Sequence, residues 1–208
     1  MERTTSIAEA KQIMGLNFIG PDELTLIADK IGIKVPKEIP IPYSLEELNN
    51  KQKDYILILG ASQMNSGDSL TLKTLRDRFG IDPDVSEPCF YNQDWYLKEE
   101  FINKPIELKW FLIRKNVFQE SRGKNPDEII VNYPFPSAIH CAYTFFVYWF
   151  HAEECLWKHD FVWCNDFDVN DDRIYVARYS DPTDLSKNGF SIHRHLRIRE
   201  NYGCLADY

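Results

Sequence analysis

The sequence predicts an α+β fold in which short N-terminal helices are followed by a mixed or antiparallel sheet packed on a long aromatic core helix. Three patterns carry this prediction: helical signals dominate the start of the chain, an almost wholly apolar helical stretch runs from Ser137 to His159, and an acidic hairpin pattern follows from Phe161 to Tyr179. The chain has 208 residues, of which 44% are hydrophobic. It is therefore long enough to bury a core without a disulfide or a metal.

The start of the chain carries two helix signals. Ser6 and Glu9 match a capping box, in which the two residues satisfy each other's free backbone groups at a helix start. Pro21 suits the first turn of a second helix, which we expect to extend to Lys30.

A proline-rich connector follows these helices. The stretch from Val35 to Tyr43 contains three prolines, which exclude a helix and favour an extended chain. We therefore expect a boundary near residue 43, with a small helical segment over residues 1–43 and an α+β domain over residues 44–208.

The middle of the chain alternates between helix and strand signals. Ser44 and Glu47 form a second capping box, and Tyr55 to Leu59 is an apolar run of strand length. Asp68 or Ser69 is expected to cap the helix that comes next. Two further strands are predicted at Leu108 to Ile113 and at Phe190 to Arg199.

Charge and targeting signals limit the class of protein. The formal net charge of −8 argues against nucleic acid, because binding to a phosphate backbone relies on clustered Lys and Arg. The N-terminus lacks the apolar stretch of a secretory signal, which predicts a soluble cytoplasmic protein, although a trimmed signal would leave the same sequence. The apolar run from Cys141 to Phe150 is too short for a membrane span.

Three residues with regular spacing are candidate zinc ligands. His151, Cys155 and His159 recur at intervals of four, which on one helix places them along one face. A stable zinc site needs three or four convincing ligands, and this set does not supply them. The alternative is a helix end whose polar side chains leave the core, with His159 near the negative end of the helix dipole. We favour this alternative and expect no metal.

The acidic hairpin resembles the start of a calcium loop. Asp166, Asp168 and Asn170 place oxygen side chains at alternate positions, as such a loop does. The glycine expected next is Asp171 and the closing glutamate is Ala177, so the turn and the bidentate ligand are missing. We expect a solvated turn whose carboxylates pair with basic residues.

The final predicted strand has a cationic face. His193, His195, Arg197 and Arg199 alternate with mostly apolar residues. Such a face could bind a carboxylate or phosphate ligand, or it could pair with the acidic hairpin as its neighbour in the sheet. The pairing is the favoured interpretation, since surface charge pairs are common.

The function predicted from these patterns is non-enzymatic binding of a protein or a small molecule, with no cofactor, because no catalytic or cofactor motif is complete. The alternative is a small-molecule hydrolase or transferase with a pocket formed by residues 89–96 and the strand of His193 and His195. The candidate catalytic residues are Cys89, His193 and His195, and the candidate ligand-binding residues are Tyr91, Asp94, Trp95 and Arg197.

Overall fold

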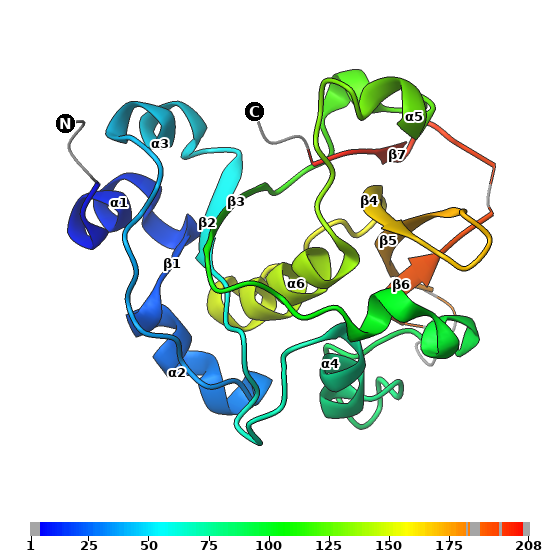
Figure 1. Cartoon of the computed structure of the whole chain (residues 1–208), viewed down its shortest axis with the longest axis horizontal. Coiled ribbons are helices and arrows are strands. Elements are labelled where there is room, and N and C mark those ends of the chain that lie inside the picture. Colours follow the sequence, from blue (N-terminus) through cyan, green and yellow to red (C-terminus); the bar gives the residue numbers. More distant parts are fainter. Residues whose placement is uncertain (1–4, 182, 184–187, 196, 206–208) are drawn as a thin grey trace.

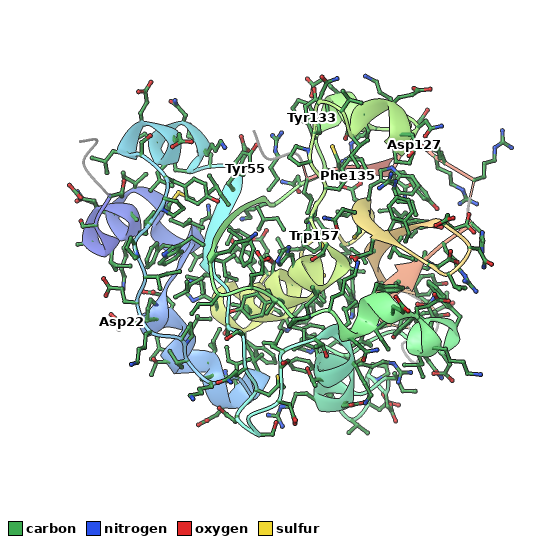
Figure 2. All side chains as sticks on the ribbon, in the orientation of Figure 1. Asp22, Tyr55, Asp127, Tyr133, Phe135 and Trp157 are labelled. Atoms are coloured by element: carbon green, nitrogen blue, oxygen red, sulfur yellow. The ribbon has the colours of Figure 1, made fainter. Side chains whose placement is uncertain are left out.

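The computed structural model describes residues 5–181, 183, 188–195 and 197–205. It confirms the α+β class, with helices and two mixed sheets, and with a cluster of aromatic side chains around one helix. Figure 1 shows the arrangement: a three-stranded sheet with its helices lies on one side of α6 (Ala138–Ala152), and a four-stranded sheet lies on the other. The space between these layers is filled with side chains (Figure 2).

The three-stranded sheet has the order β1 (Phe18–Ile19), β2 (Tyr55–Leu59), β3 (Trp110–Arg114). β1 runs parallel to β2, and β3 runs antiparallel to it. All five residues of β2 are buried, which explains why its sequence is uniformly apolar. Because β1 belongs to the first forty-three residues, that segment shares a sheet and a core with the rest. The boundary near residue 43 stays a prediction.

The helices of the first half begin largely where the sequence places them. The capping boxes of α1 (Ile7–Met14) and α3 (Leu45–Lys51) are confirmed, and α2 (Pro21–Ile31) begins at its proline. α4 (Leu72–Phe79) is capped by Thr71 rather than by Asp68 or Ser69. Short turns of 3-10 helix occupy Gly15–Asn17, Trp95–Lys98, Glu100–Asn103 and Gln119–Ser121, and a short helix α5 occupies Pro126–Ile129.

The aromatic helix is shorter than the sequence predicts. α6 ends at Ala152, because Glu153 adopts a left-handed conformation with φ of 55° and its N–H closes the last turn on Trp149. The predicted continuation to His159 is therefore wrong. Every residue from Ala138 to Tyr148 except His140 is buried, so the helix forms the centre of the fold.

The four-stranded sheet has the order β6 (Gly189–His193), β5 (Arg173–Tyr179), β4 (Phe161–Phe167), β7 (Tyr202–Gly203). β4 and β5 form the predicted hairpin. The final strand stops at His193 instead of Arg199, and two residues later His195 has a φ of 62°, which does not fit an extended strand. Both faces of this sheet are covered, one by the core around α6 and the other by a second cluster built on Trp163, Tyr175 and Tyr202.

Among the described residues, no helix is long and apolar enough to cross a membrane.

Candidate ligand-binding cleft

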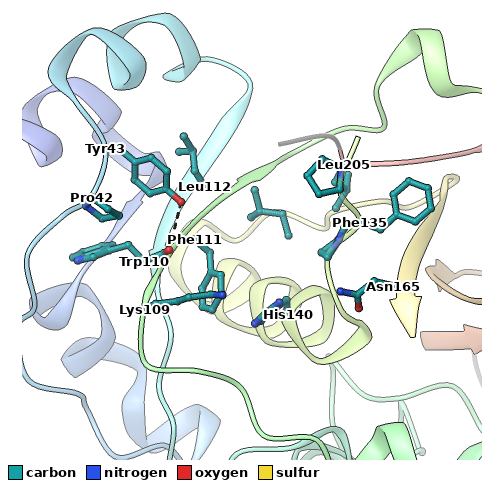
Figure 3. Close-up of a pocket in the computed structure, with 13 residues that line it drawn as sticks. Pro42, Tyr43, Lys109, Trp110, Phe111, Leu112, Phe135, His140, Asn165 and Leu205 are labelled. Atoms are coloured by element: carbon teal, nitrogen blue, oxygen red, sulfur yellow. Dashed lines mark hydrogen bonds between the residues drawn. The ribbon is translucent and has the colours of Figure 1, made fainter. Parts of the chain in front are cut away.

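A cleft with a volume of about 480 Å³ lies along β3, a size within the range of small-molecule sites. One wall is β3, the opposite wall is the segment of residues 134–136, and the first turn of α6 contributes to the lining between them (Figure 3). Most of the lining is apolar or aromatic: Pro42, Trp110, Phe111, Ile113, Phe135 and Leu205 are examples. The polar side chains are those of Tyr43, Lys109, His140 and Asn165.

The wall formed by β3 presents an outer strand edge. The backbone carbonyl of Lys109 accepts a hydrogen bond from the N–H of Gly60 at 2.9 Å, and the backbone N–H of Lys115 donates one to the carbonyl of Asp54 at 2.8 Å. The backbone groups of the odd-numbered residues between Lys109 and Lys115 therefore face β2. The backbones of Trp110 and Leu112 must then point away from β2. The Tyr43 hydroxyl donates a hydrogen bond to the Trp110 carbonyl at 3.4 Å, which agrees with this direction (Figure 3).

The opposite wall is held in place by the four-stranded sheet. The backbone N–H of Asn165 in β4 donates to the Pro136 carbonyl at 3.0 Å. The next residue, the buried Asp166, accepts hydrogen bonds from the first N–H of α6, on Ala138, at 2.7 Å and from Lys104 at 2.8 Å. A negative charge at a helix start is favourable because it meets the positive end of the helix dipole. The cleft therefore has a rigid frame.

His140, in the first turn of α6, is an ionisable group in the lining of the cleft. Its ring lies against Phe111, with 4.2 Å between the ring centroids. Burial, with a smaller contribution from the charge of Lys109, lowers the pKa of His140 to about 4. The imidazole is consequently neutral at pH 7, where it can donate one hydrogen bond and accept another.

The charge of the lining contrasts with that of the whole chain. Among the described residues that line the cleft, none is Asp or Glu, and Lys109 carries a full charge. Lys109 forms an ion pair with Glu107 at 2.5 Å, with both side chains more than half exposed. The chain as a whole carries a net charge of −8. The cleft is thus suited to apolar groups and to neutral or anionic polar groups.

The segments proposed for the alternative pocket do lie side by side. The backbone N–H of Tyr91 donates a hydrogen bond to the Phe190 carbonyl at 2.9 Å, and the Trp95 ring N–H donates one to the Ile192 carbonyl at 3.1 Å. Their contact is tight, since a Cβ added at Gly189 would lie 2.2 Å from the backbone nitrogen of Tyr91. Polar groups here are engaged with each other: Asp94 pairs with Arg76 at 2.7 Å, and Arg194 lies over the Trp95 ring.

Cys89 and His193 have surroundings that suppress their chemistry. Cys89 is fully buried, and burial raises the pKa of its thiol to about 11. His193 packs against the rings of both Phe161 and Tyr175, and burial lowers its pKa to about 4. The carbonyl of Cys89 accepts a hydrogen bond from Phe190, next to Gly189. His193 lies four residues further along this strand from Gly189, a distance of roughly 13 Å. These two side chains do not form a nucleophile–base pair, and the enzymatic alternative stays a prediction.

The remaining candidates lie elsewhere. The Nδ1 atom of His195 lies 2.8 Å from a carboxylate oxygen of Asp172, and Arg197 is exposed. His151 contacts the Leu16 carbonyl at 3.1 Å, while Cys155 and His159 lie beyond the end of α6, so the three do not share one helix face. The proposal that they bind no metal stays a prediction.

The acidic hairpin is paired with basic side chains. Asp166 binds Lys104, Asp168 binds Arg194, and Asp172 binds His195. Asp168, Asp172 and His195 also offer ligand atoms within 4.8 Å of one another. However, Asp168 already accepts two backbone hydrogen bonds, from Asn170 and Asp172, besides its ion pair with Arg194. These contacts engage both carboxylate oxygens of Asp168.

The sequence did not reveal the cleft. Tyr43, Lys109, His140, Asn165 and Leu205 come from five separate parts of the chain, with no common motif. The sequence signals were indirect: an apolar strand candidate at residues 108–113, and prolines at positions 42, 134 and 136 that exclude a helix in two of the lining segments.

Comparison with known proteins gave no match to a family model, to a curated protein or to a solved structure.

Proposed function

We propose that the protein is a non-enzymatic binding protein whose ligand occupies the cleft along β3. The observation that carries this proposal is a cavity of about 480 Å³ with an aromatic lining and four polar side chains at its border. Binding sites for small ligands and peptide side chains have this composition, because apolar walls supply affinity and a few polar groups fix orientation. A role in binding needs no activated nucleophile.

The chemistry of the polar groups supports binding over catalysis. Neutral His140 and the amide of Asn165 exchange hydrogen bonds with a ligand without a change in charge. A general base should have a pKa near the working pH, and a value of about 4 leaves the imidazole a weak base.

A titration with small aromatic compounds tests the proposal. Uniformly ¹⁵N-labelled protein is titrated with indole, p-cresol and benzoate at millimolar concentrations, and backbone amide shifts are followed. We expect shifts at Leu112, Ile113 and His140 with at least one compound. No shift at these amides with any of the three would contradict the proposed site.

Two matched variants localise the response. Asn165→Trp places a bulky ring at the border of the cleft, and Val169→Trp places the same ring at the tip of the same hairpin, where Val169 is 81% exposed. We expect Asn165→Trp to reduce the shifts at least fivefold and Val169→Trp to leave them unchanged. Equal loss in both variants would mean that the response reports a general change in the hairpin.

A further inference from the structure

We infer that the cleft receives an extended peptide that carries an acidic residue, and that this peptide adds as a strand to the outer edge of β3. This inference rests on the proposed function, because it names the class of ligand that the same cleft binds. Its basis is the direction of the β3 backbone, the alternation of the cleft walls and the sign of the local charge.

The first observation is an outward-facing peptide group in a recess. The backbone N–H and C=O of Leu112 point away from β2, and Leu112 is only 2% exposed. Within the described part of the chain, these two groups have no hydrogen-bond partner outside the sheet. Buried backbone groups are almost always paired, so this position favours a ligand that brings both an acceptor and a donor. The backbone of an extended peptide supplies this pair at one residue.

The second observation is the shape of the space beside this edge. A neighbouring strand lies about 4.8 Å from β3 and alternates its side chains above and below the sheet. On the α6 side of that position lie Phe111 and His140, whose rings contact each other. A bulky apolar side chain at every second peptide position would therefore enter the aromatic part of the cleft. Strand addition of this kind takes affinity from the main chain and specificity from such pockets.

The third observation is charge complementarity. Lys109 immediately precedes β3 and its ammonium lies over the Phe111 ring, and the described lining contains no carboxylate to compete with an incoming one. Its partner Glu107 is not part of the lining and is 68% exposed, so that ion pair contributes little and is easily exchanged. An acidic residue at the end of the peptide beside Lys109 would be attracted, whereas a basic one would be repelled.

The probe is a pool of acetylated and amidated hexapeptides. Each has Glu at both ends, so that either strand direction can be tested, and its four central positions alternate Phe, Leu, Ile or Val with Thr. The tightest member in a fluorescence polarisation assay is then used for three comparisons. We expect a Kd below 1 mM, consistent with a weak strand addition.

The first comparison tests main-chain pairing. N-methylation of the peptide amide that faces Leu112 should weaken binding about tenfold, because one buried hydrogen bond is lost. Methylation of an adjacent amide that faces away should have little effect. On the protein side, hydrogen exchange of the Leu112 amide should slow at least tenfold in the complex.

The second comparison tests the charge. Replacement of the terminal Glu residues of the peptide by Gln should weaken binding about threefold at low salt, and this difference should vanish in a Lys109→Gln variant. The exposed Lys98→Gln is the matched control and should keep the difference.

The outcomes separate the two proposals. If indole or benzoate binds in the cleft but no peptide does, or if N-methylation at both amides has the same effect, the strand-addition inference fails and the proposed function stands. If neither class of probe perturbs the cleft, both fail. A dimer in sedimentation analysis, with the Leu112 amide protected in the absence of peptide, would show that a second copy of the chain occupies the edge and would overturn the inference.

Discussion

The cleft around His140 and the aromatic cluster around His193 are built from similar residues, yet their consequences differ. Both imidazoles contact aromatic rings, and burial lowers the pKa of both to about 4. His193 is partly buried and packs on the rings of Phe161 and Tyr175, whereas the equally partly buried His140 lines a cleft of about 480 Å³. The comparison teaches that a depressed pKa marks burial, and that accessible space is what distinguishes a candidate site from a core.

The largest expected effect concerns the closed region. Trp163 is 4% exposed and packs on Tyr175 and Tyr202, with ring centroids 5.0 and 5.6 Å away. Trp163→Ala should lower the free energy of unfolding by about 3–5 kcal/mol, because the ring leaves a cavity that the sheet cannot close. Urea denaturation measures this. A loss below about 1 kcal/mol would mean that the cluster is less tightly packed than the structure indicates.

The next effect is the pH dependence that both histidines predict. The folded pKa of each lies near 4, below the unfolded value of about 6.5, so between these values the unfolded chain binds more protons. The stability contributed by the neutral imidazoles is therefore complete above pH 6.5 and is lost as the pH falls toward 4, by up to about 3 kcal/mol for each histidine.

A substitution at His193 separates the contributions of His193 and His140 to the pH dependence of stability. His193→Phe should remove the share of His193 between pH 6.5 and 4 and leave that of His140. The exposed His195→Gln serves as the control and should leave the loss due to the two partly buried histidines in place. An unchanged profile in His193→Phe, measured by denaturation at a series of pH values, would show that this imidazole is not held neutral by burial.

A smaller effect is expected at the open region. Phe111 is half-buried and borders the cleft, so Phe111→Ala should cost about 1–2 kcal/mol, less than a fully enclosed ring. The same variant should lose most of the response to indole or p-cresol, because it removes the ring that lies against His140. Retained binding with unchanged affinity would place the ligand elsewhere.

The smallest effect concerns charge. Lys109→Gln should change the free energy of unfolding by less than about 0.5 kcal/mol, since its pair with Glu107 is solvent-exposed. Thermal denaturation is the measurement. A large destabilisation would mean that Lys109 holds the cleft wall together, and its proposed role in attracting a ligand would then need another explanation.

Local signals predicted much of the fold. The capping boxes at Ser6 and Ser44, the buried strand β2 and the β4–β5 hairpin were all accessible from short stretches of sequence, because each depends on contacts within a few residues. The end of α6 was predicted wrongly. The apolar pattern continues through Leu156 and Trp157, which lie beyond the end of the helix and are both buried. These residues are apolar because they pack in the core, although they are not helical.

The cleft could not be predicted from the sequence, for a different reason. Its lining comes from β3, the segment before α6, β4 and Leu205 beyond β7, and their proximity depends on how two sheets pack around one helix. Sequence reasoning placed the candidate pocket at residues 89–96 because aromatic and polar residues are dense there. The structure packs that segment against β6, with Gly189 allowing a close approach of the two backbones.

The contrast between the two histidines is tested most directly by proton NMR of their imidazole rings during a titration with indole or p-cresol at pH 7. The ring signals of His140 should shift in a saturable manner, and those of His193 should stay fixed. Asn165→Trp should suppress the shift of His140. Equal movement of both rings, or movement of His193 alone, would contradict the assignment of the open cleft as the binding site and of the aromatic cluster as closed core.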